Sequence, residues 1–318
     1  MAGASAGLAL LDRRDRRTVA ADPKASALAR PLQGRAARLR SADGTELHVE
    51  VFGSESGPPV VLVHGWMCSL QLWRRQIVDL ASDHYVVAYD QRGHGRSGTA
   101  VTRDYSVDAL AADLDAVLHH TMAAPRPMVL AGHSMGAMGI VAWARAHPGQ
   151  VRATVAGVVL ANTGVEELVG RARVAALGTR LAPLRAAVGS RLLGAALPLP
   201  SRPGAFVSRI VRFLTLGPSA SPAEVAFATD MVMACSAAVR AGFGTTLAAL
   251  DLLDGLDSVV VPAVVLTAEH DRLTPSVHGR RIAEALPDAT LIEIPGVGHL
   301  TPIEAPCEVT GAIRRVAR

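Results

Sequence analysis

The chain has 318 residues, of which half are hydrophobic and only 3% aromatic, and its formal net charge is +4. This length and composition exclude a globally disordered chain and predict a globular protein with a large core. The three cysteines lie far apart, which excludes a disulfide framework and a zinc site built on cysteine pairs, and favours a reducing compartment.

The first 40 residues form a basic N-terminal extension. They contain nine lysines and arginines against three aspartates. We expect residues 1–40 to be helical or disordered, and a solvated tail or a helix packed on the body is favoured over an arm that touches an acidic partner or a membrane surface. No recognition motif or aromatic platform accompanies the charge, so we expect no nucleic-acid partner.

No targeting or membrane segment is recognised. The short apolar run at the start of the chain precedes its arginines, whereas a secretory signal has its basic residues first and a longer apolar run. No uninterrupted apolar run is long enough for a membrane helix. We therefore expect a cytoplasmic protein without a membrane span.

Strand and helix patterns alternate after the extension. Short apolar runs predict buried strands, and apolar residues three or four positions apart predict helices. The predicted strands are two around an Asp-Gly turn within residues 35–53, then 58–66, 84–90, 126–134, 155–163, 259–271 and 289–299. The predicted helices are 69–82, 106–121 with Ser106 as N-cap, 135–148, 275–287 and 305–317. This alternation with short connections predicts a doubly wound, mostly parallel α/β sheet.

Residues 164–247 interrupt the alternation. They contain no clear buried strand, and several prolines divide them into pieces rich in Ala, Leu and Arg. We predict a helical insertion here, between two parts of an α/β core that comprise residues 41–163 and 248–318.

Ser134 is the candidate nucleophile. It lies in the pentapeptide GHSMG, residues 132–136, where a buried strand turns directly into a helix. Such a turn strains the serine and exposes its hydroxyl at the carboxyl end of the sheet, while the glycines let strand and helix approach closely. The helix also directs free N–H groups and its positive dipole end at this point. An ordinary turn serine is the alternative that this position disfavours.

A serine hydroxyl needs a general base, and the base needs an orienting acid. His299 is the candidate base because it follows the last predicted strand on a loop that contains glycines. Asp271 is the candidate acid because it directly follows the preceding strand, at the same end of the sheet. Glu269 and residues 162–167 are rival positions for the acid.

Two backbone N–H groups are candidates for an oxyanion hole, which stabilises the negative charge that develops on a carbonyl oxygen under attack. One belongs to Met135, directly after the serine, and the other to Trp66, after the strand 58–66. His64 and Gly65 are expected to shape that loop.

The other polar loop residues are expected to be structural. No catalytic role is given to three further histidines, His94, His133 and His270. The loop 89–97 follows another buried strand, and we expect Asp90 and Arg92 to tie it to neighbouring loops.

With these residues in place, the chain resembles the α/β-hydrolase superfamily. The segments that carry the resemblance are VLVHGW (61–66), YDQRGHGRS (89–97), AGHSMGA (131–137), TAEHDRLTP (267–275) and GVGHLTPIE (296–304). The resemblance implies an eight-stranded sheet and leaves out only the basic extension. Within the superfamily the chain is similar to small esterases, haloperoxidase-like enzymes, C–C bond hydrolases and lactonases, in which residues 164–247 would form a lid. Dehalogenases and epoxide hydrolases carry aspartate at the position of Ser134, which disfavours those activities.

The charge of the inserted segment leaves two interpretations open. Its nine arginines stand against four acidic residues. Positive charge over a pocket would favour an acidic acyl group, a coenzyme A thioester or a carrier-protein phosphopantetheine. Arginines on outward helix faces, which we favour, explain the same charge without a ligand.

The sequence thus predicts a serine hydrolase that cleaves a carboxylic ester of a small or medium-sized acyl substrate through an acyl-enzyme. No metal and no organic cofactor is expected. Thioesterase, lactonase and C–C bond hydrolase activities are alternatives within the enzyme class. A non-hydrolytic protein that reuses the fold to bind a ligand is the alternative outside it. The sequence leaves the oligomeric state open.

Overall fold

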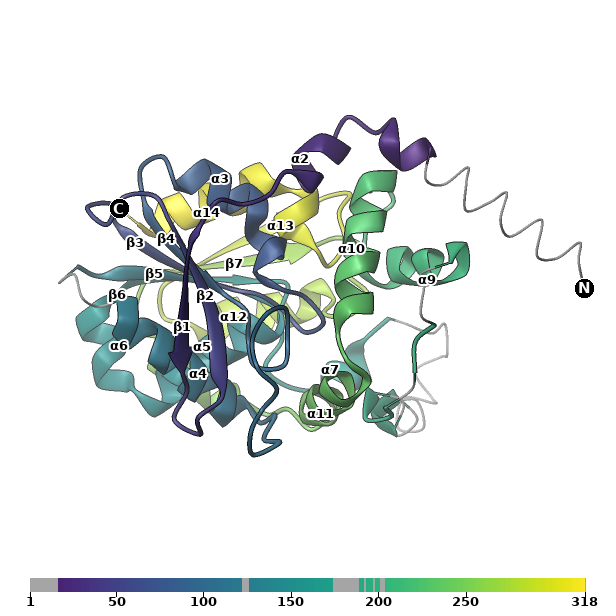
Figure 1. Ribbon diagram of the computed structural model, residues 1–318. Coiled ribbons are helices and arrows are strands. Elements are labelled where there is room, and N and C mark those ends of the chain that lie inside the picture. The colour runs from purple at the N-terminus through teal and green to yellow at the C-terminus, as the bar shows by residue number, and fades with distance from the viewer. Residues whose placement is uncertain are drawn as a thin grey trace, which may run out of the picture.

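A sheet of eight strands forms the centre of the protein, whose computed structural model describes residues 17–121, 126–173, 189–191, 193–196, 198–200 and 204–317 (Figure 1). The strands are β1 (Arg35–Arg40), β2 (Glu46–Phe52), β3 (Pro59–Val63), β4 (Tyr85–Tyr89), β5 (Met128–His133), β6 (Val155–Ala161), β7 (Ala263–Ala268) and β8 (Ala289–Ile294). Their order in the sheet is β1-β2-β4-β3-β5-β6-β7-β8. The pairs β1–β2 and β2–β4 are antiparallel and the others parallel, which confirms the predicted fold class.

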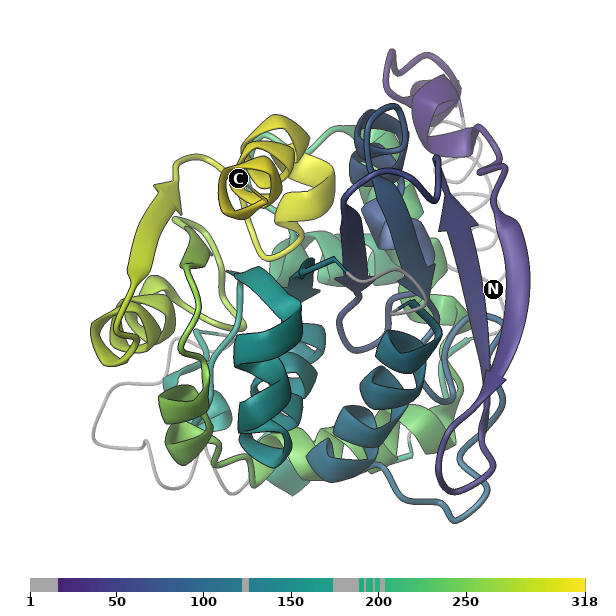
Figure 2. The ribbon, with the colours of Figure 1, turned by 90° about the vertical axis from the view of Figure 1, so that its left-hand side faces the viewer.

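The sheet is buried on both faces, as its continuous apolar runs predict. Along β3, Val61 and Val63 belong to one hydrophobic cluster, and Val60 and Leu62 to the other. The helices against the second cluster are α3 (Arg74–Leu80), which continues from the 3-10 turn η1 (Leu70–Trp73), and α14 (Pro306–Val316). The helices against the first cluster are α4 (Val107–Thr121), α5 (Met135–Ala146) and α12 (Ser276–Ala285). Figure 2 shows these layers from the side, with the yellow C-terminal helices above the sheet and the teal helices below it.

Most predicted helices are present, and some short ones are additional. The hydroxyl oxygen of Ser106 accepts the N–H of Ala109 at 3.1 Å, so it caps α4 as predicted. The additional elements are α6 (Pro148–Thr154), η3 (Leu253–Ser258) and α13 (Thr301–Glu304). Each is seven residues or shorter, and α6 and α13 begin with a proline in the first turn. Proline fits the first turn of a helix, where its missing N–H costs nothing.

Between β6 and β7 the described residues form helices joined by loops, and an isolated bridge pairs Glu166 with Asp251. The helices are α7 (Leu168–Arg171), α9 (Ala205–Thr215), α10 (Pro222–Ala234) and α11 (Ala237–Ala248). Three arginines that the sequence assigned to this segment, Arg180, Arg185 and Arg202, lie outside the described residues. Leu300 N–H donates to the carbonyl of Thr215 at 3.1 Å, so the end of α9 packs against the loop that follows β8. Figure 1 shows α9, α10 and α11 together at one end of the sheet.

No single helix among the described residues is long and apolar enough to cross a membrane. The bent pair α10 and α11, whose axes meet at 96°, passes that test by length and composition only.

Residues 17–34 form what we call the N-terminal strap, which lies against α10 (Figure 1). Its short helix α2 (Ala25–Ala29) buries Leu28 in the second hydrophobic cluster. Asp22 accepts the N–H of Ala223 at 2.8 Å, and Lys24 pairs with the buried Glu224 at 2.7 Å. The following residues 35–40, which composition groups with the basic extension, instead form β1, because they pair with β2 and their alternate residues Ala37 and Leu39 pack against the first hydrophobic cluster. The first 16 residues lie outside the described ranges.

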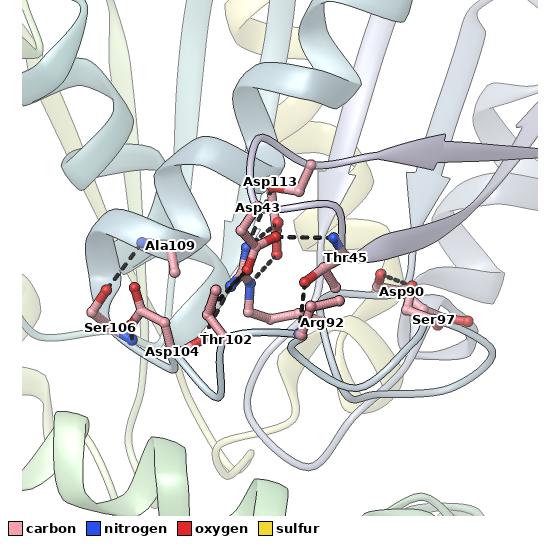
Figure 3. Close-up of polar contacts among 12 residues, drawn as sticks. Asp43, Thr45, Asp90, Arg92, Ser97, Thr102, Asp104, Ser106, Ala109 and Asp113 are labelled. Carbon is pink, nitrogen blue, oxygen red and sulfur yellow. Dashed lines mark hydrogen bonds and ion pairs between the residues drawn. The ribbon is translucent and has the colours of Figure 1, made fainter.

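The loop after β4 is tied to its neighbours by buried charges (Figure 3). The guanidinium of Arg92 binds the carboxylate of Asp113 in a bidentate pair at 2.7 and 2.6 Å, and a third nitrogen donates to Asp43 at 3.0 Å. Asp90 accepts backbone N–H groups at 2.8 Å from Arg96 and from the first residue of η1. The expected structural role of Asp90 and Arg92 is therefore seen directly.

Candidate active site

Ser134 occupies a strained turn between β5 and α5. Its φ is 51°, in the left-handed region that a residue other than glycine adopts only at a cost of about 1–3 kcal/mol. The turn is fixed by hydrogen bonds, because Ser134 N–H donates to the carbonyl of Ala161 at 2.9 Å and its own carbonyl accepts the hydroxyl of Thr163 at 2.9 Å. The side chain is half-buried. The sequence folds this way because β5 must end and α5 begin without a connecting loop.

The two glycines of the turn allow the close approach that it needs. A Cβ added to Gly132 would lie 2.5 Å from the backbone nitrogen of Ala137, and one added to Gly136 would lie 2.6 Å from the carbonyl oxygen of His64. Real Cβ atoms essentially never make contacts this short. Any larger residue would therefore push the helix away from the strand and move Ser134.

Asp271 and His299 form a buried pair at the carboxyl ends of two strands. Asp271 lies three residues after the end of β7, and His299 lies on the loop that follows β8. The two strands are neighbours in the sheet, so the two loops meet. His299 Nδ1 is 2.8 Å from Asp271 Oδ2, and both side chains are almost fully buried.

The carboxylate of Asp271 is held by further donors. Its Oδ2 accepts the side-chain amide of Asn162 at 3.0 Å and the hydroxyl of Thr274 at 2.8 Å. Its Oδ1 accepts the backbone N–H groups of Leu273 and Thr274, both at 2.9 Å. Burial opposes ionisation, but the imidazole of His299 and these hydrogen bonds outweigh it and lower the pKa of Asp271. The carboxylate is therefore ionised and fixed, with one oxygen directed at Nδ1 of the imidazole.

His133 links the Ser134 turn to the His299 loop. Its ring packs edge-on against the ring of His299 with 4.8 Å between centroids, and its Nε2 is 2.8 Å from the carbonyl oxygen of His299. Burial, together with the charge of His299, lowers the pKa of His133 to about 3, so its ring is neutral. The residue before the serine thus contacts His299 directly.

The loop after β3 approaches the same turn. A Cβ added to Gly65 would lie 3.2 Å from the Cβ of Ser134. His64 fixes the loop, because its Nδ1 is 2.7 Å from the carbonyl oxygen of Gly65 and its Nε2 accepts the N–H of Gln91 at 3.0 Å. In the part of the chain that the structure describes, the N–H groups of Trp66 and Met135 donate to no protein acceptor. Of these two residues, Met135 directly follows the serine, and Trp66 directly follows Gly65, which lies against the serine.

Sequence reasoning missed a second support of this loop. Met67, which has a φ of 59°, donates its N–H to Nε2 of His94 at 3.1 Å. The other ring nitrogen of His94 is 3.0 Å from the carbonyl oxygen of Arg92. Burial lowers the pKa of His94 to about 4, against the effect of that carbonyl, so the ring is neutral and keeps Nε2 as an acceptor. The loop 89–97 thus holds the Trp66 loop in place.

The rival acids are engaged elsewhere. The exposed Glu269 accepts the N–H of Gly296 at 2.9 Å. Glu166 pairs with Arg281, and Glu167 pairs with Arg171. Asn162, at the alternative acid position, is a partner of Asp271 and is itself held by the hydroxyl of Thr301 at 2.6 Å. The amide of Asn162 stands at the position where the alternative acid was considered. That it binds Asp271 instead can be seen only in the folded structure.

Glu304 joins the loop of His299 to the segment between α9 and α10. Its two carboxylate oxygens accept the N–H groups of Gly217 at 2.7 Å and Gly298 at 3.0 Å. Burial raises the pKa of Glu304 to about 7, although both N–H groups oppose the shift. This carboxyl group therefore changes charge near neutral pH, and it is hydrogen-bonded to Gly298, the residue before His299.

A separate pocket lies away from the candidate site residues. A pocket of about 740 Å³ lies beside η3, lined by Arg145, Asp251 and Asp254 among others, and none of the candidate site residues lines it. Within the described ranges no three His, Cys, Asp or Glu residues are grouped so that they could hold a metal ion.

Comparison with known proteins gives one family. The family model described as "Alpha/beta hydrolase family" matches residues 60–312. The protein named "Putative carbamate hydrolase RutD" of Variovorax paradoxus is 34% identical over 254 residues, which cover 80% of this chain and 89% of the relative. The pimeloyl-[acyl-carrier protein] methyl ester esterase of Chromobacterium violaceum is 29% identical, over 80% of this chain and 91% of the relative. A solved structure of a thermophilic esterase from Thermogutta terrifontis superposes with a TM-score of 0.70 and 25% identity, over 89% of this chain and all of that one.

Proposed function

We propose that this chain, which belongs to the alpha/beta hydrolase family, is a serine hydrolase that cleaves a carboxylic ester through an acyl-enzyme. That it is a hydrolytic enzyme follows from the family and from the relatives of similar length. The identity of the bond and the covalent mechanism are the proposed parts. The inserted helices between β6 and β7 would then form a lid over the site.

In the proposed mechanism, Ser134 Oγ attacks the carbonyl carbon of the substrate while His299 accepts the hydroxyl proton. The N–H groups of Trp66 and Met135 stabilise the oxyanion that forms. His299 then gives its proton to the leaving alcohol as the ester bond breaks. Water, activated by the same imidazole, attacks the acyl-enzyme and releases the carboxylic acid, which restores Ser134. Asp271 orients the imidazole and stabilises its charged form.

One observation carries this proposal, namely the buried contact between Asp271 and His299 beside a serine with positive φ. A buried carboxylate that fixes Nδ1 of an imidazole leaves Nε2 free for proton transfer. The arrangement supports an imidazole that works as a base.

An ester is the preferred substrate because of the relatives. The relative from Chromobacterium violaceum is named as a methyl ester esterase, and the solved structure from Thermogutta terrifontis is that of an esterase. The relative from Variovorax paradoxus is named as a carbamate hydrolase, so a carbamate belongs in any substrate panel. Thioesters and lactones break by the same attack on a carbonyl and complete the panel.

A fluorophosphonate probe tests the proposal directly. We expect the folded protein to be labelled at Ser134 and Ser134→Ala to lose both the label and the hydrolysis of 4-nitrophenyl esters. Ser82→Ala is the matched control, because that serine lies outside the site and bonds only to the carbonyl of Asp79. Folded wild-type protein that takes up no label and cleaves no member of the panel would instead favour a ligand-binding protein that reuses the fold.

A further inference from the structure

A basic pocket lies next to the proposed catalytic loops. It has a volume of about 350 Å³ and lies between the second half of α9 and the loop after β7. The lining residues that matter here are Arg209, Arg212, Phe213, Leu216, His270 and Arg272. No Asp or Glu lines it, and we call it the arginine pocket.

The arginines of this pocket are not paired with acids in the part of the chain that the structure describes. Among the described residues, Arg209, Arg212 and Arg272 form no ion pair with a carboxylate, whereas Arg171 and Arg281 nearby do. Glu269 lies 3.8 Å from His270 Nε2 but pairs with none of the three arginines. Residues 168–223, which include α9, contain eight arginines and no Asp or Glu, so this wall of the pocket supplies no acid from its own segment. Three guanidinium groups around one hollow repel each other, and a bound anion would remove that repulsion.

Two of the three guanidinium groups are held in place. Arg272 stacks on the ring of Phe213 with 4.4 Å between its central carbon and the ring centroid, and it donates to the carbonyl of Phe213 at 2.9 Å. Arg212 donates to the carbonyl of Pro218 at 3.2 Å. Each anchor uses one of five N–H donors, so the remaining donors stay available in a fixed orientation. Such forks suit the oxygens of phosphate and carboxylate groups.

The pocket shares its walls with the proposed catalytic loops. Arg272 directly follows Asp271 in the chain. A Cβ added to Gly298, the residue before His299, would lie 2.5 Å from the backbone nitrogen of Gly217, which also lines the pocket. A group bound in the arginine pocket would therefore lie against the same two loops that hold the acid and the base.

We propose that the arginine pocket binds a phosphate or carboxylate group of the substrate and so selects acyl compounds that carry an anionic group. The proposal rests on the proposed function for its second half, since a substrate is meant. The binding of the anion itself does not depend on Ser134 and can be measured apart from catalysis.

The first experiment measures anion binding without turnover. Inorganic pyrophosphate is titrated calorimetrically into Ser134→Ala protein at constant low ionic strength, because added salt screens such contacts. We expect binding that weakens about a hundredfold in Ser134→Ala/Arg209→Gln/Arg212→Gln, which removes two charge-assisted contacts worth roughly tenfold each. Both arginines are exposed on α9, and circular dichroism checks that the fold is retained. The matched control is Arg152→Gln on α6, an exposed arginine at the opposite end of the sheet, which should bind like the parent.

The second experiment measures selectivity on matched substrates. The mono-4-nitrophenyl ester of glutaric acid is compared with 4-nitrophenyl pentanoate for the carboxylate, and butyryl-coenzyme A with butyryl-N-acetylcysteamine for the phosphate. We expect the ratio of kcat/KM, anionic over neutral, to fall about tenfold in Arg209→Gln/Arg212→Gln and to stay constant in Arg152→Gln. The pair whose ratio falls identifies the anion.

The outcomes separate the two proposals. If pyrophosphate does not bind, or binds Arg209→Gln/Arg212→Gln protein as tightly as the parent, the arginine pocket is not an anion site. If it binds there but neither ratio changes, the pocket is not a substrate subsite. If pyrophosphate binding depends on the arginines and no acyl compound is cleaved, the proposed function fails while the anion site stands.

Discussion

Asp271 is a carboxylate held by donors from its own loop and by two donors, His299 and Asn162, that folding brings to it from distant parts of the chain. Its Oδ2 accepts from the imidazole of His299, the amide of Asn162 and the hydroxyl of Thr274. Because the other oxygen, Oδ1, also accepts two backbone N–H groups, the position requires two acceptor oxygens and no proton, which is an ionised carboxylate. A neutral side chain of the same shape would turn at least one donor toward another donor.

We expect Asp271→Asn to leave the fold intact and to lower kcat by about 10⁴-fold, the magnitude typical of this change in serine hydrolases. The amide would either face the donors with its NH₂ group or force the imidazole into the tautomer that cannot accept the serine proton. The measurement is kcat on a 4-nitrophenyl ester, with circular dichroism and melting temperature as fold controls. The rival Glu269→Gln should turn over normally, and near-normal turnover in Asp271→Asn would reassign the acid.

At the level of single residues, the sequence predicts those candidate site residues that directly follow a strand, and few of the contacts that support them. Ser134, Asp271 and His299 stand out because each follows a recognisable apolar run, and the parallel order of those runs places them at one end of the sheet. The support of the Trp66 loop by His94 and the contact of Asn162 with Asp271 join segments at least 27 residues apart. Those contacts depend on side-chain packing, for which no spacing in the chain gives a signal.

At the level of elements, α13 connects the proposed base to the inserted helices through its last residue. Glu304 accepts N–H groups from Gly217, before α10, and from Gly298, before His299. Because burial raises its pKa to about 7, the folded protein holds a proton at pH values where the unfolded chain, with a pKa near 4.5, has lost it. The stability that this proton contributes is complete below about pH 4.5 and is lost as the pH rises through 7.

We therefore expect the melting temperature of the wild type, relative to that of Glu304→Gln, to fall on the order of a few degrees between pH 5 and pH 8. Glutamine cannot ionise, so the variant lacks this contribution while other titrating groups are common to both proteins. Glu308→Gln, an exposed position on α14, is the control and should follow the wild type at every pH. A difference between the wild type and Glu304→Gln that stays constant with pH would contradict the raised pKa.

Elements were predictable where their pattern is long and regular. The buried strands and the helices α4, α5, α12 and α14 follow from apolar runs and helical spacing. The short elements α6, α13 and η3 did not, because seven residues or fewer cover at most two turns and carry no measurable period. The order of β3 and β4 in the sheet also depends on crossover connections, which the alternation of strand and helix leaves open.

At the level of the whole molecule, the N-terminal strap joins the inserted helices to the core. Arg74 of α3 donates to the carbonyl of Arg30 at 2.6 Å, and its guanidinium lies 5.2 Å from the ring centroid of Phe227 on α10. Leu28 packs in the same cluster, and Lys24 neutralises the buried Glu224. The strap, α3 and α10 thus form one packed unit, although they come from three distant parts of the chain.

We expect Leu28→Asp to detach the strap, because a carboxylate would have to be buried among apolar side chains without a partner. Amide hydrogen exchange in the first turn of α10 should then be roughly tenfold faster or more, since Asp22 would no longer accept the N–H of Ala223. Ser26→Asp places the same charge on the exposed side of α2 and is the matched control. Unchanged protection of α10 in Leu28→Asp would show that the strap does not stabilise the inserted helices.

Strand β1 is at the edge of the sheet, and it carries several of the arginines of the basic N-terminal region. It pairs only with β2, so one row of its backbone N–H and C=O groups faces away from the sheet. Such a row is a template on which a second copy of the chain could add a strand and begin to aggregate. The exposed side chains of Arg35 and Arg38 on this strand pair with Glu55 and Glu46, which surrounds the edge with charged, hydrated groups. We therefore expect Arg35 and Arg38 to disfavour self-association at this edge of the sheet, whether or not a ligand is bound.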